Sequence, residues 1–289
     1  MLDQLAYRYT QQPEASFLLM AFVVIALGAL LSASLLPPRD GLLSRSWFYQ
    51  RLGMASVLLM LNQMWWLAYV PLMQAGVSWL PALTDQLGYL AYGGYVIRIA
   101  QSRSRDAYGT AARAWLILIP FVNLILIFKA SQTPGQSLGS VGAGVVGVVF
   151  VAISRMGTSA LMTAVEEKTT ADMASPVAQA AFQSLLIAAE GPVAGLDAII
   201  AAEGAPLRVG PDLSLTTVIR QDLHVTYSFN LDMADATSLN ADYRRDITSG
   251  ICRAYLPYMS QGATVTLHYT RPDGTGVETL DLSLNTCTT

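Results

Sequence analysis

The chain has 289 residues, of which 53% are hydrophobic and only 13% are charged. A soluble globular protein carries about 25% charged residues, so this composition excludes an ordinary soluble fold for the chain as a whole. Residues 1–159 contain ten Lys and Arg against five Asp and Glu, whereas residues 160–289 contain seven against fifteen. This asymmetry predicts two regions in two environments, and the acidic second region argues against nucleic-acid binding.

The first apolar stretch, residues 16–36, is about as long as a helix that crosses a bilayer and stops at Pro37 and Pro38. It is longer than the hydrophobic region of a signal peptide, and no basic segment precedes it. We therefore expect a first membrane span that is not cleaved.

The second and third spans are predicted at residues 54–73 and 79–100. No Lys or Arg occurs between Leu52 and Ile97, whereas arginines cluster on both sides of this interval. Such a distribution indicates a membrane hairpin with both ends in the cytoplasm, which leaves the N-terminus outside.

Residues 115–128 allow two interpretations. As a helix they cover about 21 Å, which is less than the ~30 Å hydrocarbon core. Pro120 disrupts the helix and Asn123 offers polar partners, so this segment can enter the membrane and turn back. The alternative is a complete, Pro-kinked span. Residues 138–153, extended to Ala160, form the last predicted span. Four spans plus a re-entrant hairpin place the acidic half outside, whereas five spans place it in the cytoplasm.

Cys252 and Cys287 are the two cysteines of the chain, and both lie in the acidic half. An isolated pair is typical of one disulfide formed in an oxidising compartment. Two unpaired thiols are the alternative. The disulfide favours an extracytoplasmic acidic half and therefore the re-entrant hairpin.

Local patterns predict a small α+β domain at residues 205–289, joined by a helical connector at 160–204 to the transmembrane helical domain at 1–159. Apolar and polar residues alternate in the expected strands, which predicts an antiparallel sheet with one solvated face. The expected elements of the acidic half are helices at 176–189, 192–202 and 242–259, and strands at 223–231, 263–270 and 277–284.

Several short motifs of residues 205–287 also follow a pattern found elsewhere. They are Pro206-Leu-Arg-Val209, the alternating strand 223–229, a helix with the central Cys252, the strand Gly-Ala-Thr-Val-Thr-Leu-His-Tyr at 262–269, and the closing Cys287. This stretch resembles a domain of small bacterial envelope proteins and lipoproteins of unknown function. The resemblance implies a location outside the cytoplasm of a Gram-negative-type bacterium, and it implies no activity.

Polar residues within the predicted spans are the first candidate functional residues. Asn62 and Gln63 lie in mid-span, where we expect them to hydrogen-bond between helices. Asp85 and Arg98 lie near opposite ends of the third span. Ionisable groups in a span often mark an ion path, but anchoring at the two membrane interfaces also explains this pair.

A second candidate feature is a stripe of small residues at four-residue intervals, Gly139, Ala143 and Gly147, which allows another helix to approach closely. It can serve the protein's own bundle, a homodimer or a partner helix. His224 and His268 are the two histidines, and without a fixed third ligand they predict no metal site.

No nucleotide-binding, hydrolase or zinc-spacing motif occurs, so we expect no enzyme activity and no cofactor. The sequence favours an accessory, assembly or scaffolding subunit of a larger complex in the bacterial inner membrane, such as a respiratory or photosynthetic one. Its expected partners are the lipid bilayer and the helices of that complex, with the C-terminal domain in the periplasm. A small transporter or channel component is the alternative, followed by an envelope sensor.

Overall fold

The computed structural model describes residues 2–37, 41–119, 125, 128–130, 139–210, 212–232 and 241–288. They form two compact units, which are described separately. The helical unit comprises Leu2 and Arg8–Ser175, and the sheet unit comprises Asp3–Tyr7 and Pro176–Thr289. The connector predicted at 160–204 is therefore divided between the two units at Ser175.

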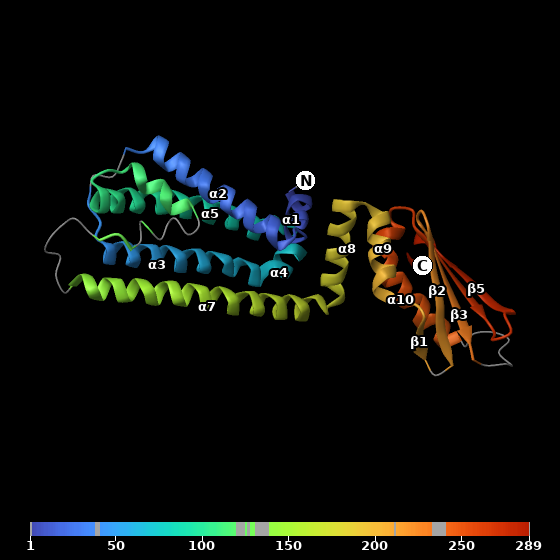
Figure 1. The fold of residues 1–289 in the computed structure, drawn as a ribbon. Helices are drawn as coiled ribbons and strands as arrows, with labels where there is room; N and C mark the ends of the chain where they lie inside the picture. The colour runs from blue at the N-terminus through green and yellow to red at the C-terminus, as the bar shows by residue number, and fades with distance from the viewer. Residues whose placement is uncertain are drawn as a thin grey trace. The chain divides into compact units, whose positions relative to one another are not determined.

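Long helices dominate the chain before Pro176 (Figure 1). Within the described residues, three helical segments are long and apolar enough to cross a membrane: Glu14–Leu35, Arg45–Gln74 and Gly142–Met173. The elements in chain order are α1 (Leu2–Thr10), α2 (Glu14–Leu35), α3 (Arg45–Asn62), the 3₁₀ helix η1 (Gln63–Ala68), α4 (Tyr69–Gln74), α5 (Trp79–Tyr108), the 3₁₀ helix η2 (Ala112–Leu118) and α7 (Gly139–Met173).

Two of the predicted spans differ from the observed helices. The third is a helix of 30 residues, α5, but it is not among the strongly apolar helices because its buried surface includes charged and amide side chains. The predicted segment 115–128 begins as the 3₁₀ helix η2, and the backbone of Ile119 is already extended. Pro120 and Asn123 lie outside the described residues.

Helices α2 and α5 pack side by side and run in the same direction. Phe17 near the start of α2 contacts Tyr89 with ring centroids 6.3 Å apart, and Arg98 reaches Pro37 just after the end of α2. Glycine allows the close approach between them: a Cβ on Gly28 would overlap the backbone carbonyl of Leu90, and one on Gly93 would overlap that of Ile25.

Helices α3 and α7 also pack in parallel, and α3 is antiparallel to α5. A Cβ on Gly147 would overlap the backbone of Tyr49, and one on Gly157 would overlap the sulfur of Met60. The Asn62 amide at the end of α3 donates to the carbonyl oxygen of Thr84 near the start of α5, at 2.9 Å. The four long helices therefore alternate in direction along the chain.

The contact between α3 and α7 gives a first testable prediction. Gly147→Ala should lower the free energy of unfolding of the helical unit by about 1–3 kcal/mol, because the added methyl group forces two backbones apart. Thermal unfolding of the full chain in detergent, followed by tryptophan fluorescence, measures this, since all five tryptophans precede residue 160.

Gly142→Ala on the same helix is the matched control, because a Cβ there meets nothing within 4 Å. Alanine is the better helix former, so this variant should unfold at the wild-type temperature or above it. Equal destabilisation by both changes would mean that α7 does not pack on α3 through Gly147.

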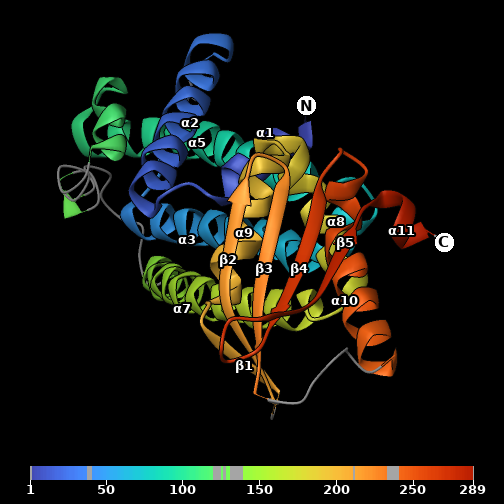
Figure 2. The ribbon, with the colours of Figure 1, turned by 90° about the vertical axis from the view of Figure 1, so that its right-hand side faces the viewer.

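The sheet unit contains two helices, a sheet and two further helices. Its elements are α8 (Pro176–Glu190), α9 (Pro192–Glu203), β1 (Leu207–Gly210), β2 (Leu213–Gln221), β3 (His224–Leu231), α10 (Ala241–Met259), β4 (Thr264–Thr270), β5 (Gly276–Leu282) and α11 (Leu284–Thr288). Figure 2 looks onto the open face of the sheet. The helices and hairpin predicted for this half are confirmed, whereas β1 and β2 were not predicted.

The sheet is mixed, so the prediction of a purely antiparallel sheet is wrong. In the described residues its strands are ordered β1-β2-β3-β4-β5, and β3 and β4 are parallel while the other neighbours are antiparallel. The reason is that α10 connects β3 to β4. This helical crossover returns the chain to the end of the sheet at which β3 begins, so β4 runs in the same direction as β3. The alternation of apolar and polar residues in each strand indicates that one face of the sheet is covered, but it does not indicate the relative direction of the strands.

One face of the sheet and the helices enclose the core of this unit. Val225, Tyr227 and Phe229 of β3 and Val265 and Leu267 of β4 are buried. Leu196 of α9 and Tyr255, Tyr258 and Met259 of α10 complete this core. The opposite face presents the hydroxyl groups and histidines of the same strands, as the sequence alternation predicts.

Candidate functional site

The candidate site of the helical unit is centred on Asp85, near the start of α5. Its side chain is buried, with a residue exposure of 2%. The Asp85 Oδ2 atom accepts hydrogen bonds from Trp66 Nε1 at 2.8 Å and from the Tyr9 hydroxyl at 3.3 Å. The rings of Tyr9 and Trp66 are stacked with centroids 5.9 Å apart. Thus α1, η1 and α5 meet at one carboxylate.

The two predicted amides lie beside this carboxylate. Gln63 Nε2 donates to the Tyr89 hydroxyl at 3.0 Å, one turn of α5 beyond Asp85. Asn62 Nδ2 donates to the backbone of α5 one residue before it, at the carbonyl oxygen of Thr84. Three of the four polar residues singled out in the predicted spans therefore gather at one end of the α3–α5 contact. Their partners Tyr9 and Trp66 were not predicted, since nothing in the sequence pairs them with residue 85.

The second oxygen of the Asp85 carboxylate, Oδ1, determines what this site can bind. Asp85 Oδ1 is buried and has no hydrogen-bond partner among the described residues. A buried polar atom without a partner costs free energy comparable to a lost hydrogen bond, so this oxygen favours a proton or an additional donor. The arrangement can hold a proton or a single cationic group. The described residues contain no group of three or more metal-binding side chains.

The fourth predicted residue, Arg98, lies farther along α5. Its guanidinium donates to the carbonyl oxygens of Leu36, at 3.4 Å, and Pro37. Carbonyls at the end of a helix lack partners within the helix, so Arg98 caps the end of α2. Asp85 and Arg98 therefore hold opposite ends of α5 to different neighbours and do not form an ion pair.

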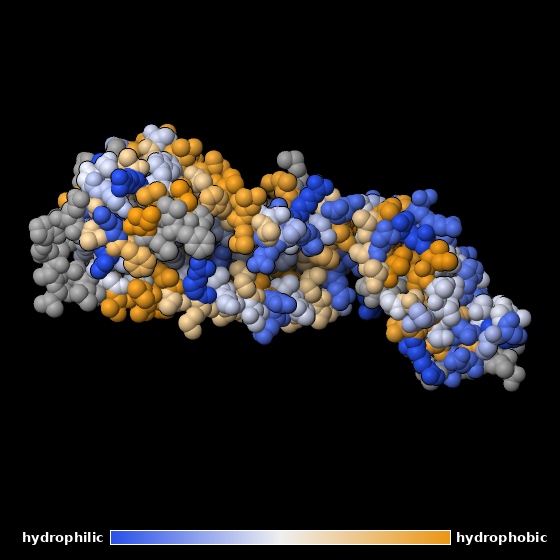
Figure 3. Space-filling view, in the orientation of Figure 1, coloured by the Kyte–Doolittle hydropathy of each residue, from blue (hydrophilic) through white to orange (hydrophobic). Residues whose placement is uncertain are grey.

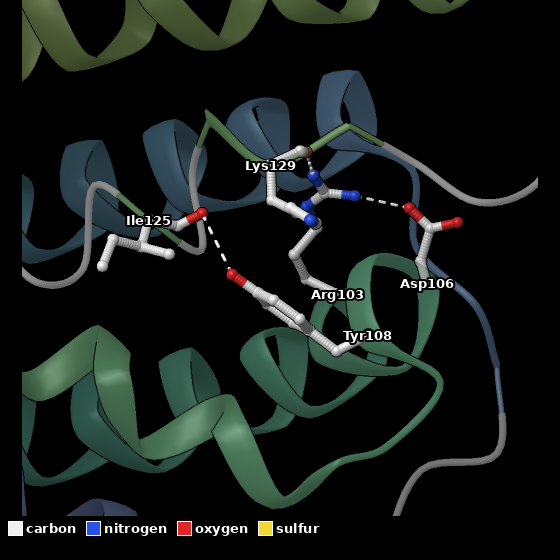
Figure 4. Close-up of polar contacts among 5 residues, drawn as sticks. All are labelled: Arg103, Asp106, Tyr108, Ile125 and Lys129. Carbon is white, nitrogen blue, oxygen red and sulfur yellow. Dashed lines mark hydrogen bonds and ion pairs between the residues drawn. The ribbon is translucent and has the colours of Figure 1, made fainter.

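A buried ion pair occupies the end of α5 near Arg98 (Figure 4). Arg103 Nη1 and Asp106 Oδ2 are 2.5 Å apart, and neither side chain is exposed to solvent. Arg103 also donates to the carbonyl oxygen of Lys129. Helix α5 ends at Tyr108, two residues beyond Asp106, and the next residue, Gly109, adopts a left-handed conformation with φ of 73° and donates its N–H to the Arg105 carbonyl.

Two described residues that follow α5 in the chain, Ile125 and Lys129, lie beside the end of this helix. The Tyr108 hydroxyl donates to the carbonyl oxygen of Ile125 at 3.5 Å, and the Lys129 ammonium lies 5.6 Å from the Tyr108 ring centroid (Figure 4). The starts of α3 and α7 lie at the same end, because Leu43 N donates to Ser102 O at 3.2 Å and Gly144 faces Ser46. Residues 109 and 129 are therefore close neighbours at one end of the bundle.

The predicted small-residue stripe lies in α7. Gly147 lies against α3, and Ala143 is buried with 7% of its surface exposed. Gly139 is the first residue of the helix. A second set of close glycine contacts, between α2 and α5, was missed because Gly28 and Gly93 are not spaced as a repeat within one helix.

Cys252 and Cys287 form the predicted disulfide, with Cα atoms 5.3 Å apart. It joins α10 to α11, which directly follows β5. His224 and His268 do lie on paired strands, but the register places them opposite Thr264 and Ser228, respectively. Their separation along the strands is about 13 Å, so they cannot share a metal ion.

A charged residue in the middle of α7 was not recognised in the sequence. Arg155 lines a cavity of about 390 Å³ that α2, α3, α5, η2 and α7 surround. Ser154 Oγ, next to it, donates to the carbonyl oxygen of Ser56 at 3.1 Å, and the Ser56 and Tyr92 hydroxyls are 3.4 Å apart. The remaining lining is mostly apolar.

The chain was compared with known proteins. No family model matches it, and no curated protein matches it. A solved structure of a Pseudomonas aeruginosa protein, which is described as a candidate secreted protein, matches part of this chain with 16% sequence identity and a TM-score of 0.29. The match covers 33% of this chain and 92% of that protein. A TM-score of this size does not establish a shared fold.

Proposed function

We propose that this protein is a non-catalytic accessory or scaffolding subunit, which docks to a larger complex in a bacterial inner membrane. The observation that carries the proposal is that polar side chains within the bundle form hydrogen bonds to neighbouring elements of the same unit. Asn62, Gln63, Asp85 and Arg98 all bond to neighbouring elements of the same unit. Such contacts fix helices against one another, as a scaffold requires.

The exposed surface of the bundle supports membrane insertion. Large apolar side chains face outward along α2, as Figure 3 shows, and along α7. In water such a surface would be costly, whereas lipid or partner helices cover it without loss. These residues include Leu18, Leu19, Phe22, Leu27, Leu30, Val145, Val148, Val149 and Met156.

The direction of the helices supports a periplasmic sheet unit. Four long helices that alternate in direction cross a bilayer an even number of times, and Tyr108 and Lys129 lie at the same end of the bundle. That end carries Arg45, Arg51, Arg103, Arg105, Arg113 and Lys129, which the positive-inside rule assigns to the cytoplasm. The end of α7 then lies on the opposite side, where an oxidising compartment suits the disulfide.

Labelling of the cysteines tests this topology. After reduction, a membrane-impermeant maleimide should label Cys252 and Cys287 in intact spheroplasts as completely as in lysed cells. A variant with Cys252 and Cys287 replaced by alanine and a new cysteine at Gly109 is the control, and it should react only after lysis. The opposite pattern would place the sheet unit in the cytoplasm.

Purification with partners tests the function itself. The tagged full chain, extracted in a mild detergent, should retain a larger membrane complex in stoichiometric amounts, which mass spectrometry identifies. Asn62→Ala with Gln63→Ala should weaken the bundle itself and is therefore unsuitable as a docking control. Recovery of the chain alone, as a monomer or homo-oligomer from membranes that contain its native partners, would contradict an accessory role.

A transporter component is the second candidate, and the unpartnered Asp85 Oδ1 atom is the observation that favours it. A buried carboxylate that gains and loses a proton or cation is typical of coupled transport. Ion flux into proteoliposomes that contain the purified chain, and its loss in Asp85→Asn, would support this function. Absence of flux above empty vesicles would leave Asp85 with a role in helix packing alone.

A further inference from the structure

Arg155 lies where a charge is most costly if α7 spans a membrane. It is about 24 Å along the helix from Gly139 and about 16 Å before Glu166, the next charged residue. Apart from Arg155, the residues of α7 between Gly139 and Glu166 are either apolar residues or small polar residues. An arginine near the centre of a bilayer is costly to insert, and such residues are normally paired.

The described residues of the helical unit offer Arg155 no counter-ion near this level. Among the described residues Arg155 has no ion pair, Asp85 bonds to Trp66 and Tyr9, and Asp106 pairs with Arg103. The undescribed residues of 120–138 include no Asp or Glu. A neutralising group must therefore come from another molecule.

The surroundings of Arg155 form an open apolar cleft. Phe22 and Ile25 of α2 and Val151 of α7 are among its lining residues. Phe22 is 45% exposed and Arg155 is exposed as well. A second helix could place its own side chains against this lining and a carboxylate beside the guanidinium.

We propose that this cleft is the docking site for a transmembrane helix of the partner complex, and that this helix carries an Asp or Glu near its middle. The inference rests on the proposed function, because it presumes membrane insertion and a partner. The depth of Arg155 distinguishes this occupant from a lipid. A lipid head group lies at the interface, about 15 Å from the bilayer centre, whereas a carboxylate on the middle of a helix is held at that level.

A defined probe tests the proposal without the native partner. Synthetic 24-residue Leu/Ala helices with a central Asp, Asn or Leu carry a dansyl group and are added to the full chain in phosphatidylcholine vesicles. Energy transfer from the tryptophans reports association. The Asp peptide should bind the wild-type chain about tenfold more tightly than the Leu peptide, which is the effect of one strong interhelical polar contact. The Asn peptide should lie between them.

Three variants on α7 assign the effect. Arg155→Gln should abolish the preference for the Asp peptide, and Arg155→Lys should keep most of it. Lys168→Gln, which removes a cation in an exposed ion pair on the same helix, should leave the preference unchanged. Equal binding of Asp and Leu peptides to the wild type, or a preference that survives Arg155→Gln, would overturn the docking site. Either result is independent of whether the chain co-purifies with a complex, which is the test of the accessory role.

Discussion

Asp106→Ala should lower the free energy of unfolding of the helical unit by about 3–5 kcal/mol, the largest effect expected for a single polar substitution in this chain. Neither Asp106 nor Arg103 exposes its side chain, and their charged atoms are 2.5 Å apart. Removal of the carboxylate deprives a buried guanidinium of this ion-pair partner. The bond from Arg103 to the Lys129 carbonyl remains, but a carbonyl dipole does not replace a full negative charge.

An exposed ion pair on α7 is the matched control. Lys168 and Asp172 are 2.7 Å apart at helical spacing, but their side chains are 46% and 29% exposed. Asp172→Ala should therefore cost no more than about 0.5 kcal/mol. Unfolding in detergent, followed by tryptophan fluorescence, compares the two variants. Equal small losses would mean that water reaches the Arg103 pair.

A double replacement separates the charge from the packing. Arg103→Met with Asp106→Leu removes both charges and keeps apolar volume, so it should recover much of the stability lost in Asp106→Ala. It should still loosen the return of residues 125–129 to α5, because the bond to Lys129 is lost. Faster proteolysis of the 109–138 connection in the double variant would measure that effect.

The sequence was sufficient where the deciding information is local. The apolar spacing at 176–189 predicts a helix there, and α8 occupies nearly the same residues. The helix predicted at 242–259 likewise corresponds to α10. The disulfide could be predicted because the chain contains a single pair of cysteines. The parallel pairing of β3 and β4 was also within reach, since an intervening helix of this length makes a parallel crossover the ordinary outcome.

The partners of the buried polar groups could not be predicted in the same way. Asp85 bonds to Tyr9 and Trp66, which are 76 and 19 residues away along the chain. Those contacts depend on how α1 and η1 are placed against α5, and single-sequence patterns carry no such information. The pairing of Gly28 with α5 has the same origin, because a lone glycine in an apolar helix does not identify the helix that it faces.

Arg155 was passed over for a different reason. The last span is predicted at residues 138–153 with an extension to Ala160, which places Arg155 near its end, and the sequence assigned this residue no role. The observed helix α7 continues to Met173, which places Arg155 well inside it. Because α7 is longer than the predicted span, Arg155 lies near the middle of the helix and not near its end.

Loss of the disulfide should destabilise the sheet unit by about 4 kcal/mol, the second large effect. The cross-link closes a loop with a sequence separation of 35 residues. In the chain-entropy model, its removal raises the conformational entropy of the unfolded state and so lowers the free energy of unfolding by this amount. The variant is Cys252→Ala with Cys287→Ala in the full chain. Amide hydrogen exchange of β3 and β4, measured by mass spectrometry, should accelerate about a thousandfold if these strands exchange by global opening of the unit.

Reduction provides the control for this effect and locates its origin. Dithiothreitol should accelerate exchange in the wild type to the rate of the double variant, and it should leave the double variant unchanged. The edge strand β5 should lose protection first, because α11 follows it directly and the disulfide holds α11 to α10. Leu282 of β5 is buried opposite Val265 of the neighbouring strand β4, so release of this edge opens the core itself. If exchange changes only in α11 while β3 and β4 stay protected, the cross-link secures the C-terminal helix and contributes little to the stability of the core.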